Sequence, residues 1–229
     1  MDRAIVLFDL DNTLLDFDKA EAIALSKTLR EFGLEPTEEI LRRYNEINKR
    51  HWEMLEDGIL TRQQVLVGRY EQLFNEFGID MDGAAAAKSY EANLSIGHHF
   101  IEGAEALLRE LFGKHDMYIV SNGTAVVQEG RLKSSGIGPF FKKIFISEHL
   151  GYDKPSKQFF DKCFSQIEDF DPARTVIIGD SLTSDIRGGL NAGIISCWYN
   201  PKGLSAREDI KPHYVISRLE DIPALLEIL

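Results

Sequence analysis

Six short apolar segments recur along the chain, and they constrain its fold more than any other feature. Each has three to six residues, is rich in isoleucine or valine, and lacks the strict alternation of a strand with one solvated face. Continuous apolar runs of this length are typical of strands buried on both faces of a parallel sheet. The segments are residues 4–8, 117–120, 143–146, 175–178, 194–199 and 214–216.

Helical patterns separate most of these segments, and strand and helix in alternation predict an α/β fold, here a Rossmann-like parallel sheet flanked by helices. Residues 15–97 are the exception, because they contain only helical patterns, one of which opens with the capping box of Thr61 and Gln64. We therefore expect an α/β core of residues 1–14 and 98–229, with an all-α cap domain of residues 15–97 inserted into it. The helical patterns of the core include residues 103–112, 155–167 and 184–192.

The composition limits the classes of partner. A formal net charge of −11 over 229 residues argues against binding to a nucleic-acid backbone. A small phosphorylated substrate is still compatible with this charge, because a metal ion and one lysine can reverse the local potential. No apolar run approaches the ~20 residues that span a bilayer, and no secretion signal is expected at the N-terminus. Cys163 and Cys197 lie in apolar surroundings, so we expect reduced core thiols in a cytoplasmic protein, with one disulfide as the alternative.

Polar side chains follow four of the predicted strands. In an open α/β sheet, ligands bind beyond the carboxyl ends of the strands, so these side chains are expected to converge on one edge. Several carboxylates at one edge repel each other unless a cation lies among them, and hard oxygen ligands suit Mg²⁺. The side chains concerned are Asp9, Asp11, Ser121, Asn122, Lys154, Asp180 and Asp185.

Each of these positions also has a purely structural explanation. The acids can cap turns or helices. Asn122-Gly123 can supply a positive φ in a turn, and Lys154 can be a solvated residue before a helix that begins at Pro155. The joint occurrence of all four groups, in order, at four strand ends favours a functional site over these explanations.

Four short stretches, "DLDNT", "VSNG", "DKP" and "GDSLTSD", resemble the four motifs of the haloacid-dehalogenase-like phosphohydrolase superfamily. The resemblance covers essentially the whole chain, and the insertion is placed as in members with a helical, C1-type cap. It implies that the nucleophile is Asp9 and that the general acid and base is Asp11. It implies that the phosphoryl group is bound by Ser121, Asn122 and Lys154. It implies that Mg²⁺ is bound by Asp9, the main-chain carbonyl of Asp11 and Asp180, with Asp185 at the metal site to support the water shell of the ion.

The spacing of the first two acids fits this chemistry. Alternate side chains of an extended backbone share a face, so Asp9 and Asp11 can both reach one substrate. A carboxylate that attacks phosphorus forms an aspartyl phosphate, and the leaving oxygen then needs a proton donor. The dehalogenases of the superfamily attack carbon and typically lack the second aspartate. The resemblance therefore implies a Mg²⁺-dependent phosphomonoesterase.

Longer stretches are most similar to the pyrimidine 5′-nucleotidase group of the superfamily, which implies a nucleoside monophosphate as substrate. They are "NEINKRHWEMLEDGILTRQQVLVGRYEQLF", "HLGYDKPSKQFFD" and "GDSLTSDIRGGLNAGI". Asn48 and Trp52 lie one helical turn apart and can contact a base, and Phe17 can line the cleft between cap and core. Alternatively, Trp52 and Phe17 pack against cap helices and Asn48 is solvated.

Several alternatives to this function stay open. The enzyme can be a phosphatase of small metabolites, such as a sugar phosphate or phosphoglycolate, or a phosphomutase. A non-catalytic binding protein on the same scaffold is a further alternative, which the complete set of motif residues disfavours. We expect a monomer or a weak homo-oligomer without nucleic-acid or membrane partners.

Overall fold

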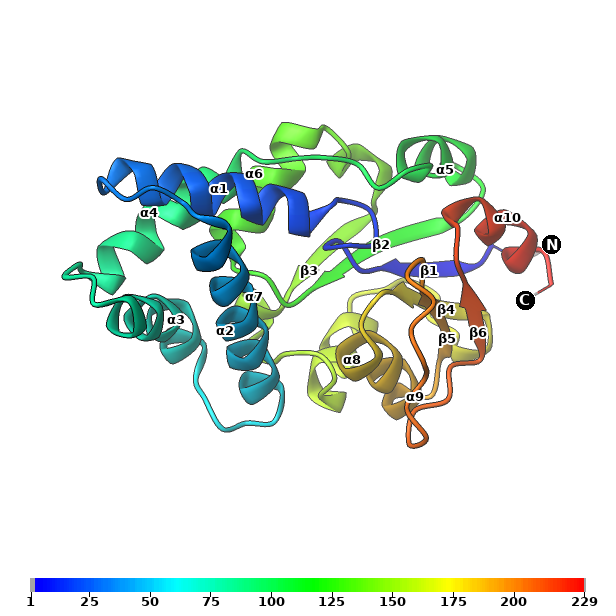
Figure 1. The fold of residues 1–229 in the computed structure, drawn as a ribbon. Helices are drawn as coiled ribbons and strands as arrows, with labels where there is room; N and C mark the ends of the chain where they lie inside the picture. The colour runs from blue at the N-terminus through cyan, green and yellow to red at the C-terminus, as the bar shows by residue number, and fades with distance from the viewer. Residues whose placement is uncertain (1–2, 229) are drawn as a thin grey trace. The chain divides into compact units, whose positions relative to one another are not determined.

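The computed structural model describes residues 3–228, and its centre is a six-stranded parallel sheet of order β3-β2-β1-β4-β5-β6 (Figure 1). This confirms the predicted fold class. Each strand coincides with one of the apolar segments, with ends that shift by at most one residue. The strands are β1 (Ile5–Phe8), β2 (Asp116–Ser121), β3 (Lys143–Ile146), β4 (Thr175–Gly179), β5 (Ile195–Tyr199) and β6 (Tyr214–Ile216).

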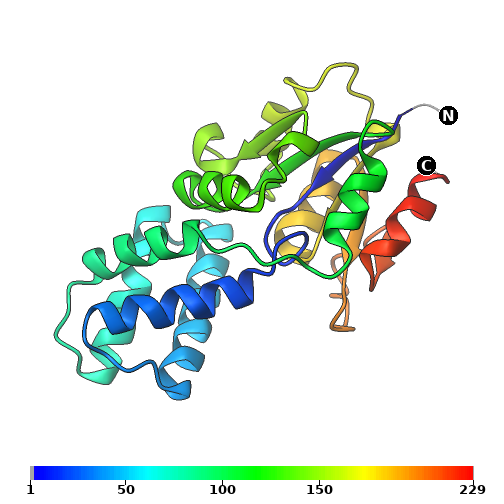
Figure 2. The same ribbon diagram turned by 90° about the horizontal axis from the view of Figure 1, so that it is seen from above.

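Helices cover both faces of the sheet, which explains why the strand sequences are apolar without alternation (Figure 1). In β1, Val6 and Phe8 belong to a cluster with residues of α5 (Ala104–Leu111), α6 (Ala125–Ser135) and α10 (Ile222–Leu226). Ile5 and Leu7 point to the opposite face and pack with residues of α8 (Lys157–Phe164). Helix α9 (Arg187–Ala192) lies beside α8, whereas α5 and α10 lie side by side in Figure 2.

Residues 18–97 form a second compact unit, separate from the rest of the chain. It consists of α1 (Phe17–Glu31), α2 (Glu38–Glu56), α3 (Arg62–Phe77) and α4 (Gly83–Ser95), where α1 begins at the last residue of the other unit. The predicted capping box is present at the start of α3. The Thr61 hydroxyl accepts a hydrogen bond from the main-chain N–H of Gln64, and Gln64 Oε1 accepts one from the main-chain N–H of Thr61. Gly78 ends α3 in the left-handed conformation, with φ of 63°.

Two helices of the α/β unit begin later or differently than predicted. The pattern at 155–167 forms α8 only from Lys157, because Ser156 is its N-cap and accepts a hydrogen bond from the main chain of Phe159. The first three residues of the pattern at 184–192 belong to a π-helical turn at Leu182–Ile186, and α9 begins directly after it at Arg187. The short helix α7 (Ser147–Leu150) follows β3.

Cys163 and Cys197 are buried free thiols, as the sequence predicted, and do not form a disulfide. Within residues 3–228 no helix is both long and apolar enough to cross a membrane.

Candidate active site

Three carboxylates come together at the carboxyl ends of two neighbouring strands. Asp9 directly follows β1 and Asp180 directly follows β4, and the main-chain N–H of Asp9 bonds the carbonyl of Ile178 at 2.9 Å. Asp185 lies on the π-helical turn after β4. One oxygen from each of the three aspartates lies within 4.8 Å of the other two. The carboxyl group of Asp11 is outside this set.

A glycine at the end of β4 makes this cluster possible. A Cβ atom at Gly179 would lie 2.2 Å from Asp185 Oδ2, so any side chain there would displace the carboxylate. In its observed place, Asp185 Oδ2 accepts a hydrogen bond from the main chain of Ser181 at 3.1 Å. The glycine of the fourth motif is therefore required for space rather than for a special backbone angle.

Lys154 lies among these acids and is 1% exposed. Its Nζ donates to Asp9 Oδ1 at 2.8 Å, to Asp185 Oδ1 at 2.6 Å and to the carbonyl of Val120 at 2.8 Å. The Asn122 side chain fixes the main chain of Lys154, accepting from its N–H at 2.8 Å and donating to its carbonyl at 2.9 Å. Two of the predicted phosphate ligands are thus linked, with Asn122 positioning the lysine.

The electrostatics of the cluster favour a bound cation. Burial raises the pKa of the Asp9 carboxyl to about 7, although Lys154 opposes this shift. Burial, followed by the charges of Asp9 and Asp185, raises the pKa of Asp180 well above its usual value. Burial works against the charge of Lys154, but the carboxylates of Asp185 and Asp9 outweigh it and raise the pKa of the lysine. One ammonium therefore does not neutralise three acids, and hard oxygen donors in this arrangement fit Mg²⁺.

Asp11 is held by a different group of residues, which sequence reasoning missed. Its Oδ2 accepts from Gln128 Nε2 at 2.6 Å, and its Oδ1 contacts Arg131 Nη1 in an ion pair. Gln128 Nε2 also donates to Ser121 Oγ at 2.7 Å. Both side chains come from α6, which follows β2. A signal was present in the sequence, because Gln128 and Arg131 are polar residues on the same face as the buried Val127 of that helix.

Thr13 is a third residue that the sequence pattern did not single out. It is fully buried, and its hydroxyl donates to Asp9 Oδ2 at 3.0 Å. With Lys154 on Oδ1, both oxygens of Asp9 therefore have a donor. The loop between Asp9 and Thr13 turns tightly, with Asn12 in the left-handed conformation at φ of 58°.

Gly123 has a different reason for being glycine than the predicted turn. Among residues 3–228, neither Asn122 nor Gly123 has a positive φ, so a turn with positive φ does not explain this Asn-Gly pair. A Cβ atom at Gly123 would instead lie 2.3 Å from Gln128 Nε2. The glycine leaves the space that the Gln128 amide occupies between Asp11 and Ser121.

The residues proposed for substrate specificity lie in different settings. Asn48 is 6% exposed rather than solvated, because its amide accepts from Arg69 Nη1 at 2.7 Å and donates to Glu21 Oε1 at 2.6 Å. Trp52 is half-buried, and the Arg62 guanidinium lies 5.7 Å from its ring centroid. The amide of Asn48 is therefore part of a polar network inside the helical unit.

Phe17 lies in the α/β unit, where the Arg131 guanidinium carbon is 5.5 Å from its ring centroid. Its main-chain N–H donates to Asn12 Oδ1 at 2.9 Å. Phe17 is therefore in contact both with the loop after β1 and with Arg131, which pairs with Asp11.

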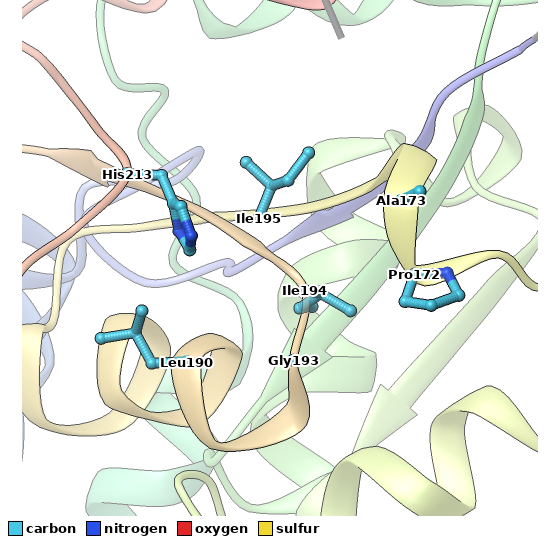
Figure 3. Close-up of a pocket in the computed structure, with 7 residues that line it drawn as sticks. All are labelled: Pro172, Ala173, Leu190, Gly193, Ile194, Ile195 and His213. Carbon is cyan, nitrogen blue, oxygen red and sulfur yellow. The ribbon is translucent and has the colours of Figure 1, made fainter.

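A separate pocket of about 500 Å³ lies near the amino ends of β4 and β5, and residues before these strands line it (Figure 3). It is mostly apolar, with His213 as its one ionisable residue. Because the candidate side chains lie at the opposite ends of these strands, this pocket is separate from the candidate site. The lining residues are Pro172, Ala173, Leu190, Gly193, Ile194, Ile195 and His213.

Comparison with known proteins identifies similar chains. The sequence profile of the haloacid dehalogenase-like hydrolases matches residues 6–199. YfnB of Bacillus subtilis is 41% identical over 97% of this chain and 95% of its own length. The pyrimidine 5′-nucleotidase PynA of Streptococcus pneumoniae is 40% identical over 95% of this chain and 92% of its own. The pyrimidine 5′-nucleotidase YjjG of Escherichia coli is 30% identical over 96% of both chains.

Solved structures show the same fold. The crystal structure of YfnB bound to magnesium superposes with a TM-score of 0.95, at 40% identity and 99% coverage of both chains. L-2-haloacid dehalogenase from Xanthobacter autotrophicus has a TM-score of 0.78 with full coverage of both chains, but only 18% identity. The second likeness concerns the fold alone.

Proposed function

Because this chain belongs to the haloacid dehalogenase-like hydrolases, we propose that it is a Mg²⁺-dependent phosphomonoesterase that acts on pyrimidine nucleoside 5′-monophosphates. The observation that carries the proposal is the convergence of Asp9, Lys154, Asp180 and Asp185 at one sheet edge, with Asp11 held beside it by α6. This arrangement provides a nucleophile, a cation site and a separate acid–base group. The pyrimidine assignment is supported by two nucleotidase relatives that align along nearly the whole chain.

The metal would be held by the clustered carboxylates of Asp9, Asp180 and Asp185, together with the main-chain carbonyl of Asp11. When bound, it supplies positive charge that offsets the repulsion between the acids and the phosphate and polarises the phosphoryl group. The raised pKa values of Asp9 and Asp180 support this assignment, since a nearby cation favours the ionised form of both.

In the first step, an oxygen of Asp9 attacks phosphorus while the bond from phosphorus to the ester oxygen breaks. Asp11 gives its proton to the leaving oxygen, which departs as the alcohol of the nucleoside. Lys154 stabilises negative charge on the phosphoryl oxygens, and Ser121 donates a neutral hydrogen bond. The product of this step is an aspartyl phosphate on Asp9, with Asp11 left as a carboxylate.

In the second step, Asp11 takes a proton from water as the water oxygen attacks phosphorus. The bond between phosphorus and Asp9 breaks, which releases phosphate and restores the Asp9 carboxylate. Thr13 and Lys154 each donate to one oxygen of the Asp9 carboxylate, so the side chain is held in place once phosphate has left. Such fixed donors are available without reorganisation when charge develops.

Several observations separate this function from the alternatives. Asp11 is a proton donor that a halide leaving group does not need, so the likeness to a dehalogenase structure does not extend to its reaction. A non-catalytic role is disfavoured because Asp9, Asp180 and Asp185 cluster around the buried Lys154, which an inactive scaffold would not require. Sugar-phosphate hydrolysis would use the same residues on another substrate, whereas a phosphomutase would return the phosphoryl group from Asp9 to a sugar and release no phosphate.

The specificity of the enzyme is assigned to the helical unit and the loop after β1. Trp52 and Phe17 are our candidates for contact with a base, because each has an aromatic ring that is only partly buried. Asn48 is given a supporting role instead, since both atoms of its amide bond other side chains of the helical unit. We also propose a cytoplasmic location and a monomeric or weakly associated state.

The test is phosphate release with and without Mg²⁺ from UMP, dUMP, dTMP, several sugar phosphates and phosphoglycolate. Asp9→Asn is assayed beside Asp161→Asn, a matched change at an exposed acid on α8. We expect Asp9→Asn alone to abolish turnover and a pyrimidine nucleotide to lead by about tenfold in kcat/KM, or about 1.4 kcal/mol of transition-state preference. A higher kcat/KM for a sugar phosphate would overturn the substrate assignment. Halide release from a 2-haloacid without Mg²⁺ would overturn the proposed phosphomonoesterase reaction.

A further inference from the structure

Helix α6 carries two polar side chains that are almost completely buried. Gln128 is 1% exposed and Arg131 is 0% exposed. They are three residues apart, so they lie on one face of the helix and reach the same region. Arginine is almost never fully buried unless it has a specific partner, so these contacts call for an explanation.

The partners of both side chains belong to the candidate active site. Arg131 Nη1 forms the ion pair with Asp11 Oδ1, and Gln128 Nε2 donates to Asp11 Oδ2 at 2.6 Å. The same Gln128 nitrogen donates to Ser121 Oγ at 2.7 Å. One helix therefore fixes the orientation of the proposed acid–base carboxyl and joins it to the hydroxyl proposed to bind phosphate.

The orientation of the Gln128 amide carries an energetic cost. Its Oε1 is buried and accepts no hydrogen bond from any residue in the described part of the chain. A buried acceptor without a partner costs about 1–3 kcal/mol. Position 123 is also adapted to this amide, because any residue other than glycine there would collide with Gln128 Nε2. The arrangement is therefore better explained by the position of Asp11 than by stability.

We propose that Gln128 and Arg131 are positioning residues that aim Asp11 at the leaving-group oxygen of the substrate. This inference rests on the proposed function and assigns a further role within it. A carboxylate oxygen has two lone pairs, so Asp11 can keep its bonds to α6 and still exchange a proton with a third partner. The Asp11 side chain is 26% exposed, which leaves it accessible for that exchange.

The role of Asp11 as proton donor provides a readout that a merely structural role would not change. An alkyl ester such as UMP needs protonation of its leaving oxygen, whereas 4-nitrophenyl phosphate has a stable leaving anion and needs little. Misplacing Asp11 should therefore slow hydrolysis of UMP more than hydrolysis of the aryl ester. The ratio of the two kcat/KM values, measured on one preparation, does not depend on the fraction of protein that is folded.

The experiment measures this ratio in Gln128→Met, Arg131→Met and Arg131→Lys. Gly123→Ala displaces the Gln128 amide without changing α6, and Lys133→Met is a matched control at an exposed position of the same helix. Asp11→Asn is the reference for loss of the proton donor. General acid catalysis contributes about 10²–10⁴-fold, so we expect the ratio to fall by roughly tenfold or more in Gln128→Met, Arg131→Met and Gly123→Ala.

Arg131→Lys keeps the charge and is expected to restore part of the ratio, and Lys133→Met is expected to match the wild type. Equal losses for both esters in the α6 variants, with a selective loss in Asp11→Asn, would overturn this inference and leave the proposed function intact. No selective loss in Asp11→Asn, or no hydrolysis of either ester by the wild type, would overturn the proposed reaction and this inference with it.

Discussion

Replacement of Lys154 by methionine should destabilise the protein strongly when divalent cations are removed. The substitution keeps the length and apolar body of the side chain but deletes the ammonium that bonds Asp9, Asp185 and the carbonyl of Val120. Lys154 is 1% exposed, so water cannot replace these bonds without opening the site. Three carboxylates within 4.8 Å of each other would then lack a protein cation.

The expected magnitude follows from this burial. Removing one partner of a buried ion pair costs about 3–5 kcal/mol, which corresponds to roughly 6–20 °C in Tm for a chain of this size. The pKa of Asp9, raised to about 7, lets this residue take up a proton and reduce the loss in acid. Lys154 lowers this pKa, so its removal favours the protonated form of Asp9 still more, and the measurement is made at about pH 8 to limit this compensation.

The assay is thermal unfolding in a chelator and again with saturating Mg²⁺. A matched control is Lys157→Met, where the lysine side chain is 66% exposed and pairs with Asp161 one helical turn away. That surface pair is worth about 0.3–0.5 kcal/mol, so its loss should barely move Tm. Added Mg²⁺ should narrow the gap between Lys154→Met and the wild type, because the ion replaces the lost charge. Equal Tm values for Lys154→Met and the wild type in chelator would refute the electrostatic account of the cluster.

Three further predictions concern the acid cluster and the helical unit. Without divalent cations, the stability of the wild type relative to Asp9→Asn should fall as pH rises from about 4 to 7, because the raised pKa makes folded Asp9 retain a proton that the unfolded chain has lost. A constant difference between the denaturation midpoints of the two proteins across this range would contradict it. Gly179→Ala should displace the Asp185 carboxylate and lower the free energy of unfolding by about 1–3 kcal/mol. It should also remove most of the affinity for Mg²⁺, as measured by titration calorimetry, and wild-type affinity would disprove the steric argument. Arg69→Met should lower the free energy of unfolding, measured in urea, by about 1–3 kcal/mol, because the buried amide oxygen of Asn48 loses its donor. An unchanged urea midpoint would show that this hydrogen bond is dispensable.

The strands could be predicted closely because burial on both faces leaves a plain signal in the sequence. The segments 143–146 and 214–216 have the same limits in the structure as in the prediction. The helix predicted at 184–192 was less accurate at its start, because a π-helical turn places Asp185 beneath Gly179. A hydrophobic pattern gives no information on such a turn, because the turn involves hydrogen bonds of the Asp185 carboxylate.

The motif acids could be located from their order at strand ends, whereas their partners could not. Arg131 is 120 positions from Asp11 in the sequence, and no local pattern links the two. Asn48 was expected to be open to solvent or substrate, but it bonds Glu21 and Arg69 from two other helices. A polar residue on an apolar helix face indicates that a hydrogen-bond partner is required, but only the tertiary structure identifies that partner.

The proposed reaction requires Asp9 to become covalently phosphorylated. The most direct measurement is to quench the enzyme in acid during turnover of UMP with Mg²⁺, reduce it with borohydride, and locate the modified residue by mass spectrometry of peptides. Borohydride reduces an acyl phosphate to an alcohol, so the account predicts homoserine at position 9 in the wild type and none in Asp9→Asn. Phosphate release without modification at position 9, or with a phosphoryl group on Ser121, would contradict it.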